Sequence, residues 1–112
     1  MRRIFASCAP AAFVAILAAL ALPGSAAAQD DAAKNFKANC VLCHSADGSG
    51  SSPTGKTLKA KDLRSDEVQK KSDAELTETI TKGKGKMPAF GPKFSPDLIK
   101  SLVAYIRAMA KK

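Results

Sequence analysis

The stretch NCVLCHSADGSG, residues 39–50, places two cysteines and a histidine within five positions. Cys40 and Cys43 are separated by two residues, and His44 follows the second cysteine directly. After residue 28 the chain contains no other cysteine and no other histidine. All cysteine and histidine chemistry of that part of the chain is therefore concentrated in one motif, and the surrounding sequence must decide which chemistry it is.

The first 28 residues have the composition of an export signal. Two arginines precede a long apolar run, and a proline–glycine break then leads into small residues that end at Ala28. This order is typical of a secretory signal peptide. We expect cleavage after Ala28, a mature domain over residues 29–112, and a location in the periplasm or an equivalent space outside the cytoplasm. The alternative is an uncleaved membrane anchor, because residues 4–22 are nearly long enough to span a bilayer.

The predicted mature domain is small and basic. It has 84 residues, and its net charge is +6 rather than the +8 of the whole chain because both leader arginines are lost. It contains no tryptophan, and Tyr105 is its only tyrosine. Domains of this size bury a modest fraction of their surface and usually need a disulfide, a metal or a cofactor for stability. We therefore expect the chain to fold around a bound group.

The apolar residues recur with helical spacing, and no segment alternates with period two. Helices are expected over residues 30–40, capped by Asp30 or Asp31, over 72–82 and over 95–112. Ser72 and Glu75 form the sequence signature of a capping box, and the last helix begins with a serine cap followed by proline. Residues 45–65 are rich in Gly, Ser, Thr, Pro and Lys, which favours a loop. The sequence therefore predicts an all-α domain.

Several chemistries compete for the CVLCH motif. A thioredoxin-like dithiol needs a strand before it and a sheet around it, and neither is predicted. A structural zinc site needs four nitrogen or sulfur ligands, whereas the mature domain offers three in one short run. A disulfide between Cys40 and Cys43 would close a very small loop and stabilise little. The C-x-x-C-H pattern is typical of covalent c-type haem attachment, and this chemistry uses all three side chains.

Haem attachment assigns a role to each residue of the motif. Cysteines three positions apart lie about one helical turn from each other, so each thiol can add to one of two neighbouring vinyl groups. His44 is then held beneath the iron as the proximal ligand. The candidates for a ligand on the opposite face are Met87 and Met109. Pro88 biases Met87 toward an extended shape in a glycine-rich loop, whereas Met109 lies on the apolar stripe of the last helix and is expected to fill the core.

With these residues in place, the chain resembles a class I cytochrome c, of the small single-haem kind near bacterial cytochromes c-551/c-555 and the cytochrome c6 group. The resemblance covers residues 31–110 and rests on CVLCH after a first helix, on KMPAF at residues 86–90 and on the final amphipathic helix. It implies a fold of three to four helices around one covalently bound haem c, with the N- and C-terminal helices crossing. The residues expected to meet at that crossing are Ala32 and Phe36 with Leu102 and Tyr105.

The resemblance also implies how the haem is surrounded. In the family a proline carbonyl in the loop after the motif accepts a hydrogen bond from the proximal histidine, and Pro53 is the candidate here. We expect the iron ligands to be His44 and Met87. The residues expected to bind the rest of the cofactor are Cys40, Cys43, Pro53, Leu63, Leu76, Ile80 and Phe90.

The predicted function is that of an exported one-electron carrier, because histidine–methionine ligation fills both axial sites of the iron. No catalytic residue and no small-molecule substrate are expected. Two groups of lysines lie in segments that the family places near the haem edge: Lys82, Lys84, Lys86 and Lys93 around Met87, and Lys56, Lys59 and Lys61 in the other loop. A basic ring there would steer the protein to redox partners with acidic docking surfaces. Nucleic acid is not an expected partner, because no recognition motif is present.

Three alternatives to the freely diffusing carrier stay open at this point. The same domain could be held by an uncleaved N-terminal anchor, as the electron-transfer subunit of a larger redox complex, and only then would it contact a membrane. It could be a haem-based ligand sensor or enzyme, which needs an open sixth site on the iron. It could also be a haem-free dithiol or metal-binding module.

Overall fold

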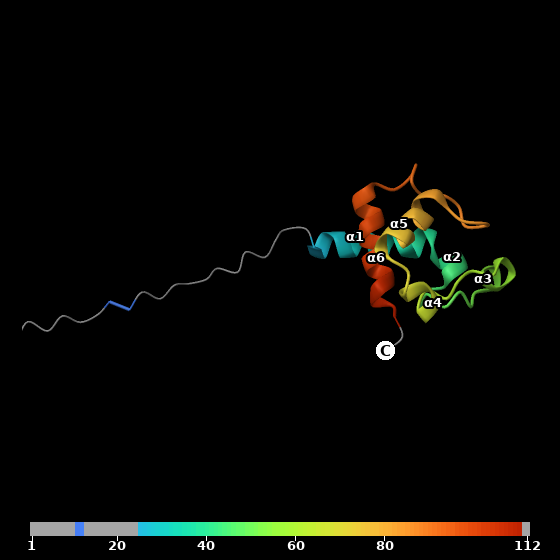
Figure 1. Ribbon diagram of the computed structural model, residues 1–112, viewed down its shortest axis with the longest axis horizontal. Coiled ribbons are helices and arrows are strands. Elements are labelled where there is room, and N and C mark those ends of the chain that lie inside the picture. The colour runs from blue at the N-terminus through green and yellow to red at the C-terminus, as the bar shows by residue number, and fades with distance from the viewer. Residues whose placement is uncertain (1–10, 13–24, 111–112) are drawn as a thin grey trace, which may run out of the picture.

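In a computed structural model the described residues, 11–12 and 25–110, form helices and no β-sheet (Figure 1). The helices are α1 (Ser25–Asn39), α2 (Val41–His44), α3 (Pro53–Leu58), α4 (Asp66–Gln69), α5 (Asp73–Lys82) and α6 (Pro96–Ala108). The all-α prediction is therefore confirmed. The predicted signal peptide falls largely on residues 1–10 and 13–24, which lie outside the described residues. None of the helices in the described part is both long and apolar enough to cross a membrane.

The three longer helices correspond to the three that the sequence predicts, with displaced boundaries at the start of α1 and at the end of α6, which ends at Ala108 rather than at residue 112. Within the described residues α1 is already helical at Ser25, ahead of the predicted caps Asp30 and Asp31, because the three alanines that follow Ser25 have high helix propensity. The capping box of α5 is present: Ser72 Oγ accepts from the Glu75 N–H at 3.1 Å, and Glu75 Oε2 accepts from the Ser72 N–H at 3.1 Å.

Two short helices lie in this part of the chain: α3 within the predicted loop over 45–65, and α4 directly after it. Ser52 caps α3, its Oγ accepting from the Gly55 N–H at 3.0 Å, and Pro53 holds the first helical position. Ser65 caps α4 in the same way. The prediction of an uninterrupted loop over 45–65 is therefore wrong at residues 53–58, because one serine cap and one proline are enough to start a single turn of helix.

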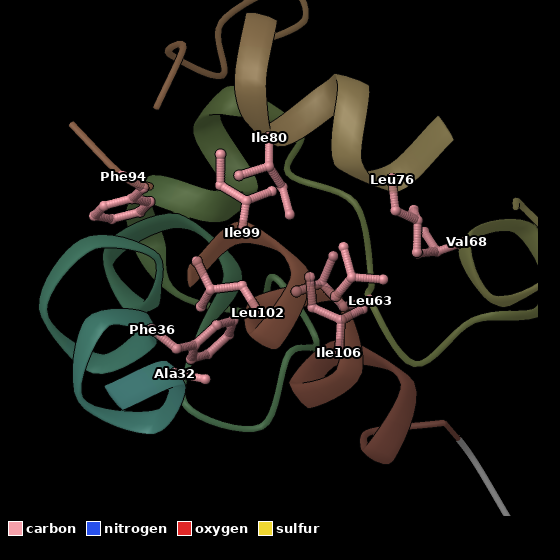
Figure 2. Packing of buried hydrophobic residues seen from close by; sticks show 11 residues of the cluster. Ala32, Phe36, Leu63, Val68, Leu76, Ile80, Phe94, Ile99, Leu102 and Ile106 are labelled. Atoms are coloured by element: carbon pink, nitrogen blue, oxygen red, sulfur yellow. The ribbon is translucent and has the colours of Figure 1, made fainter. Parts of the chain in front are cut away.

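The centre of the fold is the crossing of α1 and α6 (Figure 1). Ala32 and Phe36 of α1 are buried there against Leu102 of α6 (Figure 2). The ring of Phe36 also lies 5.0 Å from that of Tyr105, tilted by 43°. The predicted crossing is confirmed. Each buried Leu or Phe side chain contributes roughly 1.5–3 kcal/mol to folding by leaving water, so this contact organises the domain.

The other side of α6 supports the elements that carry the candidate site. Ile80 of α5 lies near Ile99 of α6, and Leu76 of α5 lies beside Val68 of α4 (Figure 2). Leu63, from the segment before α4, packs near Ile106 of α6. α6 therefore holds α1 on one face and the Leu63–Ile80 half of the core on another.

Candidate functional site

The CVLCH motif forms a single helical turn directly after α1. Cys40 caps α2, and its carbonyl accepts from the Cys43 N–H at 3.2 Å and from the His44 N–H at 2.8 Å. Cys40 and Cys43 are both half-buried free thiols. Leu42, between them, is 71% exposed. The turn therefore brings the two thiols to one short stretch of the surface, with His44 following them immediately.

Burial changes the acidity of the first thiol. Desolvation, and secondarily the neighbouring Cys43, raises the pKa of Cys40 to about 11. A thiol whose pKa is raised in this way is less activated as a nucleophile than a redox dithiol requires. This argues against the redox-dithiol alternative.

His44 is oriented by a backbone carbonyl. Its Nδ1 lies 3.0 Å from the oxygen of Lys61, and since a carbonyl can only accept, Nδ1 carries the proton and donates. The other ring nitrogen, Nε2, is thereby left in the form that can bind a metal. Pro53 was predicted as the acceptor, and this prediction is wrong. Pro53 is exposed at the start of α3, and its carbonyl instead accepts from the Thr57 hydroxyl at 3.0 Å, because α3 turns it into the helix.

Two glycines allow the segment that carries Lys61 to lie against the segment that carries His44. A Cβ placed on Gly55 would overlap the carbonyl oxygen of Cys43 and lie 2.5 Å from that of Gly50. A Cβ placed on Gly50, which has φ +71°, would lie 2.8 Å from Ala60 O. The N–H of Gly50 donates to His44 O at 2.8 Å. Side chains at these positions would push the two backbones apart.

Ser45, the residue after His44, adopts a backbone conformation that L-residues rarely adopt. It has φ 66° and ψ 160°, a region populated mainly by glycine. Its Oγ accepts from the Ser52 N–H at 2.9 Å, and the Ser52 hydroxyl donates to Leu42 O at 2.7 Å. These two serines therefore tie the turn after the motif to the start of α3.

Met87 lies in a loop that is fastened to the end of α5. Lys84 and Met87 exchange two backbone hydrogen bonds, of 3.1 and 3.0 Å, and Phe90 N–H donates to Ile80 O at 2.9 Å. Gly83, at φ +74°, approaches the loop so closely that a Cβ would lie 2.5 Å from Met87 O. In Figure 1 this loop extends toward the side of the molecule where α2 and α3 lie. Met87 is half-buried and packs against the core, so its thioether is presented by a fixed loop.

The rival methionine is placed differently. Met109 is the C-terminal cap of α6, half-buried against the core, and its sulfur lies so near Gly48 that a Cβ there would be 2.8 Å from it. Its side chain is therefore engaged in packing, as predicted.

The predicted apolar residues around the cofactor come together in one cluster. Leu63, Leu76 and Ile80 are buried, and Phe90 is half-buried and stacked on Phe94, with ring centroids 5.0 Å apart. Cys40 and Met87 pack against the same cluster. The structure therefore gathers Leu63, Leu76, Ile80 and Phe90 with Cys40 and Met87 in one cluster, of which Pro53 is not a member.

The functional residues that the sequence missed act through their backbones. Lys61 supplies a carbonyl, and a carbonyl is present at every residue, so no side-chain pattern could single it out. Gly50 and Gly55 were visible as glycines within the predicted loop, but a glycine in a loop does not say which strand of chain it approaches. Only the close approach itself identifies their role.

Comparison with known proteins assigns the fold to a family. A family model described as cytochrome C oxidase, cbb3-type, subunit III, matches residues 27–106. Cytochrome c6 of Microcystis aeruginosa is 39% identical over 82 residues, which cover 73% of this chain and 98% of that protein. The chain belongs to the class I c-type cytochromes. Cytochrome c6 of Gloeothece citriformis is 37% identical over 91 residues, covering 80% of this chain and 79% of that protein.

Two further relatives differ in how much of their own length this chain covers. The FixP subunit of the cbb3-type cytochrome c oxidase of Azorhizobium caulinodans is 37% identical over 91 residues, but the chain spans only 30% of that subunit. The solved structure of the KustC0563 c-type cytochrome has 32% identity and a TM-score of 0.67, covering 72% of this chain and 99% of that one. The recurring unit is thus a single domain that occurs alone or within a longer subunit.

Membership in this family establishes the cofactor and the class of function. This cytochrome is a monohaem one-electron carrier with one covalently bound haem c, and its partners are redox proteins. The donor set of the structure fits that group: two free thiols one turn apart, a histidine with one ring nitrogen left for a metal, and an apolar cluster beside a methionine-bearing loop.

Proposed function

We propose that this cytochrome is an exported electron carrier that holds its haem through thioether bonds at Cys40 and Cys43 and through His44 and Met87 at the iron. The observation that carries the proposal is the His44 Nδ1–H bond to the Lys61 carbonyl, because it leaves Nε2 as the ligating nitrogen beside two free thiols. When bound there, haem supplies reversible one-electron exchange between ferric and ferrous iron.

The protein groups at this site hold and tune the cofactor, and none of them is placed to transform a substrate. The Lys61 carbonyl fixes the ring plane of His44 and makes the imidazole more basic. The loop that bears Met87 is fastened by backbone hydrogen bonds, so the thioether would be held in place to bind the iron and to leave no open position for a small molecule. A filled sixth site supports a carrier and argues against an enzyme or a ligand sensor.

The spectrum of the holo-protein tests the ligand set. We expect an absorption band of iron–sulfur coordination in the ferric protein, its loss in Met87→Ala, and a lower reduction potential in that variant. Met109→Ala is the matched control, and it is expected to keep the band and to lower only the unfolding free energy. Survival of the band in Met87→Ala would refute the assignment of Met87, and rapid carbon monoxide binding by the ferrous wild-type protein would favour a sensor or enzyme.

The docking partner is proposed to carry an acidic surface. Leu42, with 71% of its surface exposed, lies on α2 between the two cysteines and offers an apolar contact at the site. Four exposed lysines in α3, after it, or in the Met87 loop have no ion pair among the described residues: Lys56, Lys59, Lys84 and Lys86. Because their charges are uncompensated, they can attract carboxylates over about 10 Å at moderate salt.

The remaining lysines of the predicted basic ring have partners within the protein. Lys61 pairs with Glu67 at 2.9 Å, and Lys82 pairs with Glu78 at 3.1 Å. Lys93 donates to Asn39 Oδ1 at 2.6 Å. We therefore expect charge reversal at Lys84 and Lys86 to slow association with an acidic redox partner and to flatten its salt dependence, and the same change at Lys82 to have a smaller effect. Equal effects at the three positions would contradict the distinction between lysines with and without a partner inside the protein.

A second candidate is the same domain acting as the anchored electron-transfer subunit of a larger redox complex. The observation that favours it is the family model, which is described as a subunit of a cbb3-type oxidase. N-terminal sequencing of the protein recovered from cells distinguishes the two candidates. A chain that begins at Gln29 and is released with the soluble periplasmic fraction supports the exported carrier, and an intact leader in the membrane fraction supports the anchored subunit.

A further inference from the structure

The side chain of Gln69 joins the site to α6. Gln69 is the last residue of α4, and its Nε2 donates to Leu63 O at 2.8 Å and to Ile106 O at 3.0 Å. Both acceptors are backbone carbonyls, one in the segment between α3 and α4 and one in α6. A single half-buried amide thus bridges two parts of the chain that are 43 residues apart.

Arg107 of α6 reinforces this bridge from the other side. Its guanidinium donates from Nη1 to Gln69 O at 2.7 Å, from Nη2 to Lys71 O, and from Nε to Asp73 Oδ1 at 3.0 Å. The planar fork matches three acceptors at the junction of α4 and α5, which a lysine ammonium could not do with the same geometry. The arginine side chain is 28% exposed, whereas that of Asp73 is 77% exposed, so the two carbonyl contacts are the sheltered ones.

The segment held in this way is the one that orients the proximal histidine. Residues 59–65 lie between α3 and α4 and have no helix of their own, so their path depends on specific hydrogen bonds. Leu63, two residues after Lys61, donates its N–H to Gly48 O at 2.7 Å and gives its carbonyl to Gln69. The exposed ion pair of Lys61 and Glu67 is weak by comparison. Leu63 therefore contributes to the position of the Lys61 carbonyl from one side, and the Ala60 N–H, which donates to Gly55 O at 2.8 Å, contributes from the other.

We propose that Gln69 and Arg107 are positioning residues that hold the Lys61 carbonyl against His44 by tying residues 61–73 to α6, and thereby set the reduction potential of the haem. The inference rests on the proposed ligation by His44. A firm Nδ1–H bond to a carbonyl makes the imidazole a stronger donor and favours ferric iron. Loosening the tie weakens that bond, so the potential rises.

The test uses the holo-protein with Gln69→Met, which keeps the length of the side chain and removes both donated hydrogen bonds. We expect an upward shift of the reduction potential and exchange of the His44 Nδ1 proton with solvent that is about fivefold faster in the ferrous protein, the effect of weakening one hydrogen bond. Arg107→Lys keeps the positive charge near Asp73 but loses the two-carbonyl contact, and it is expected to shift both quantities in the same direction. If Gln69→Met does not fold, Arg107→Lys alone tests the proposal.

The matched control is Asp73→Asn, which removes the carboxylate and leaves the carbonyl contacts of Arg107 in place. It is expected to lower the unfolding temperature slightly while the potential and the proton exchange stay at wild-type values. The proposal is overturned if Gln69→Met or Arg107→Lys lowers stability with both quantities unchanged, because the tie would then be merely structural. Failure of the proposed function is distinguishable, since the wild-type spectrum itself would then lack histidine–methionine coordination.

Discussion

The α1–α6 crossing and the segment from Cys43 to Leu63 are held together in different ways. The crossing is an apolar contact in which Ala32, Phe36 and Leu102 are almost completely buried. In the other region only Leu63, at its end, belongs to the buried core; the rest is closed by backbone hydrogen bonds, by the hydroxyls of Ser45 and Ser52, and by two glycines that let one segment approach the other. The packing of the crossing therefore depends on the volume of its side chains, whereas the close approach of segments in the other region depends on glycines that have none.

This difference predicts how each region responds to substitution. At the crossing, removing atoms leaves a cavity and costs stability without moving the residues around the haem. In the backbone-packed region, adding a single carbon displaces the segments that carry His44 and Lys61. Substitutions at the crossing should therefore lower stability and leave the reduction potential unchanged, whereas substitutions in the backbone-packed region should change both.

The largest effect is expected at the crossing, from Phe36→Ala. The substitution removes a ring that is 2% exposed and lies 5.0 Å from that of Tyr105, and it should lower the unfolding free energy by roughly 4 kcal/mol. Phe36→Leu is the control, expected to cost about 1.5 kcal/mol because it retains most of the volume. Urea denaturation of the holo-protein measures both. A large change in potential in Phe36→Leu would contradict the separation of the two regions.

In the backbone-packed region the strongest substitution is Gly55→Ala. The added Cβ would overlap Cys43 O, so we expect a loss of roughly 3 kcal/mol together with a changed reduction potential. Gly85→Ala is the control: unlike Gly55, this glycine has a positive φ, of 58°, but nothing lies within 4 Å of the added carbon. Only the left-handed backbone penalty of about 1 kcal/mol should then appear. Equal losses in the two variants would show that close approach at Gly55 is unimportant.

A smaller effect of opposite sign is expected at Lys59, the C-cap of α3. Lys59 has φ 56° and ψ 44°, a left-handed conformation that helix ends usually assign to glycine. Lys59→Gly should raise the unfolding free energy by about 1 kcal/mol. Lys59→Ala removes the same charge and keeps the strained conformation, so it should give no such gain. If both variants were equally stabilised, relief of charge repulsion rather than of strain would be the cause.

The smallest effect is expected from the pH dependence of Asp47, near the start of the same region. Hydrogen bonds from Ser49, and then the Arg64 guanidinium 3.7 Å away, hold the pKa of this carboxyl below its ordinary value. A carboxyl with a lowered pKa in the folded state contributes stability that is fully present above about pH 4 and is lost as the pH falls through the folded-state pKa.

Measurement of unfolding midpoints from neutral to acidic pH tests this expectation for Asp47. Wild type should be more stable than Asp47→Asn at neutral pH, and the difference should vanish in acid. Arg64→Gln should raise the pKa of Asp47 only slightly, because Ser49 makes the larger contribution. A difference between wild type and Asp47→Asn that persists unchanged in acid would contradict the assignment.

The part of the site that could be predicted from sequence consists of residues with distinctive side chains. Cys40, Cys43 and His44 are adjacent, so their geometry follows from one helical turn, and Met87 precedes a proline in a glycine-rich loop. The apolar residues Leu63, Leu76 and Ile80 were expected to be near the cofactor and lie in one buried cluster. The helix at 53–58 was missed because a single turn of helix depends on caps that also occur in loops, and the earlier start of α1 was missed because Asp30 and Asp31 resemble caps, whereas the alanines ahead of them extend the helix.

The prediction that the Pro53 carbonyl accepts the hydrogen bond from His44 was wrong because it relied on a conspicuous side chain. A proline in the loop after the motif was the conspicuous residue, but the acceptor is a main-chain oxygen, and any residue could have supplied it. Which carbonyl lies beside His44 depends on the path of the chain through α3 and on the glycines that allow close contact. It also depends on Gln69 and Arg107, which lie 25 and 63 residues after His44.

The sequence by itself determined the helical class, the crossing of the first and last long helices, and the motif that takes the haem. The helical class follows from periodicity and the motif from side chains within one helical turn, whereas the crossing was expected from the resemblance to class I cytochromes c. The tertiary structure alone decided that Lys61 orients His44, that three of the seven predicted docking lysines are held by partners within the protein, and that α6 supports the site. Backbone groups are the same at every residue, so only the folded path of the chain determines which of them meet.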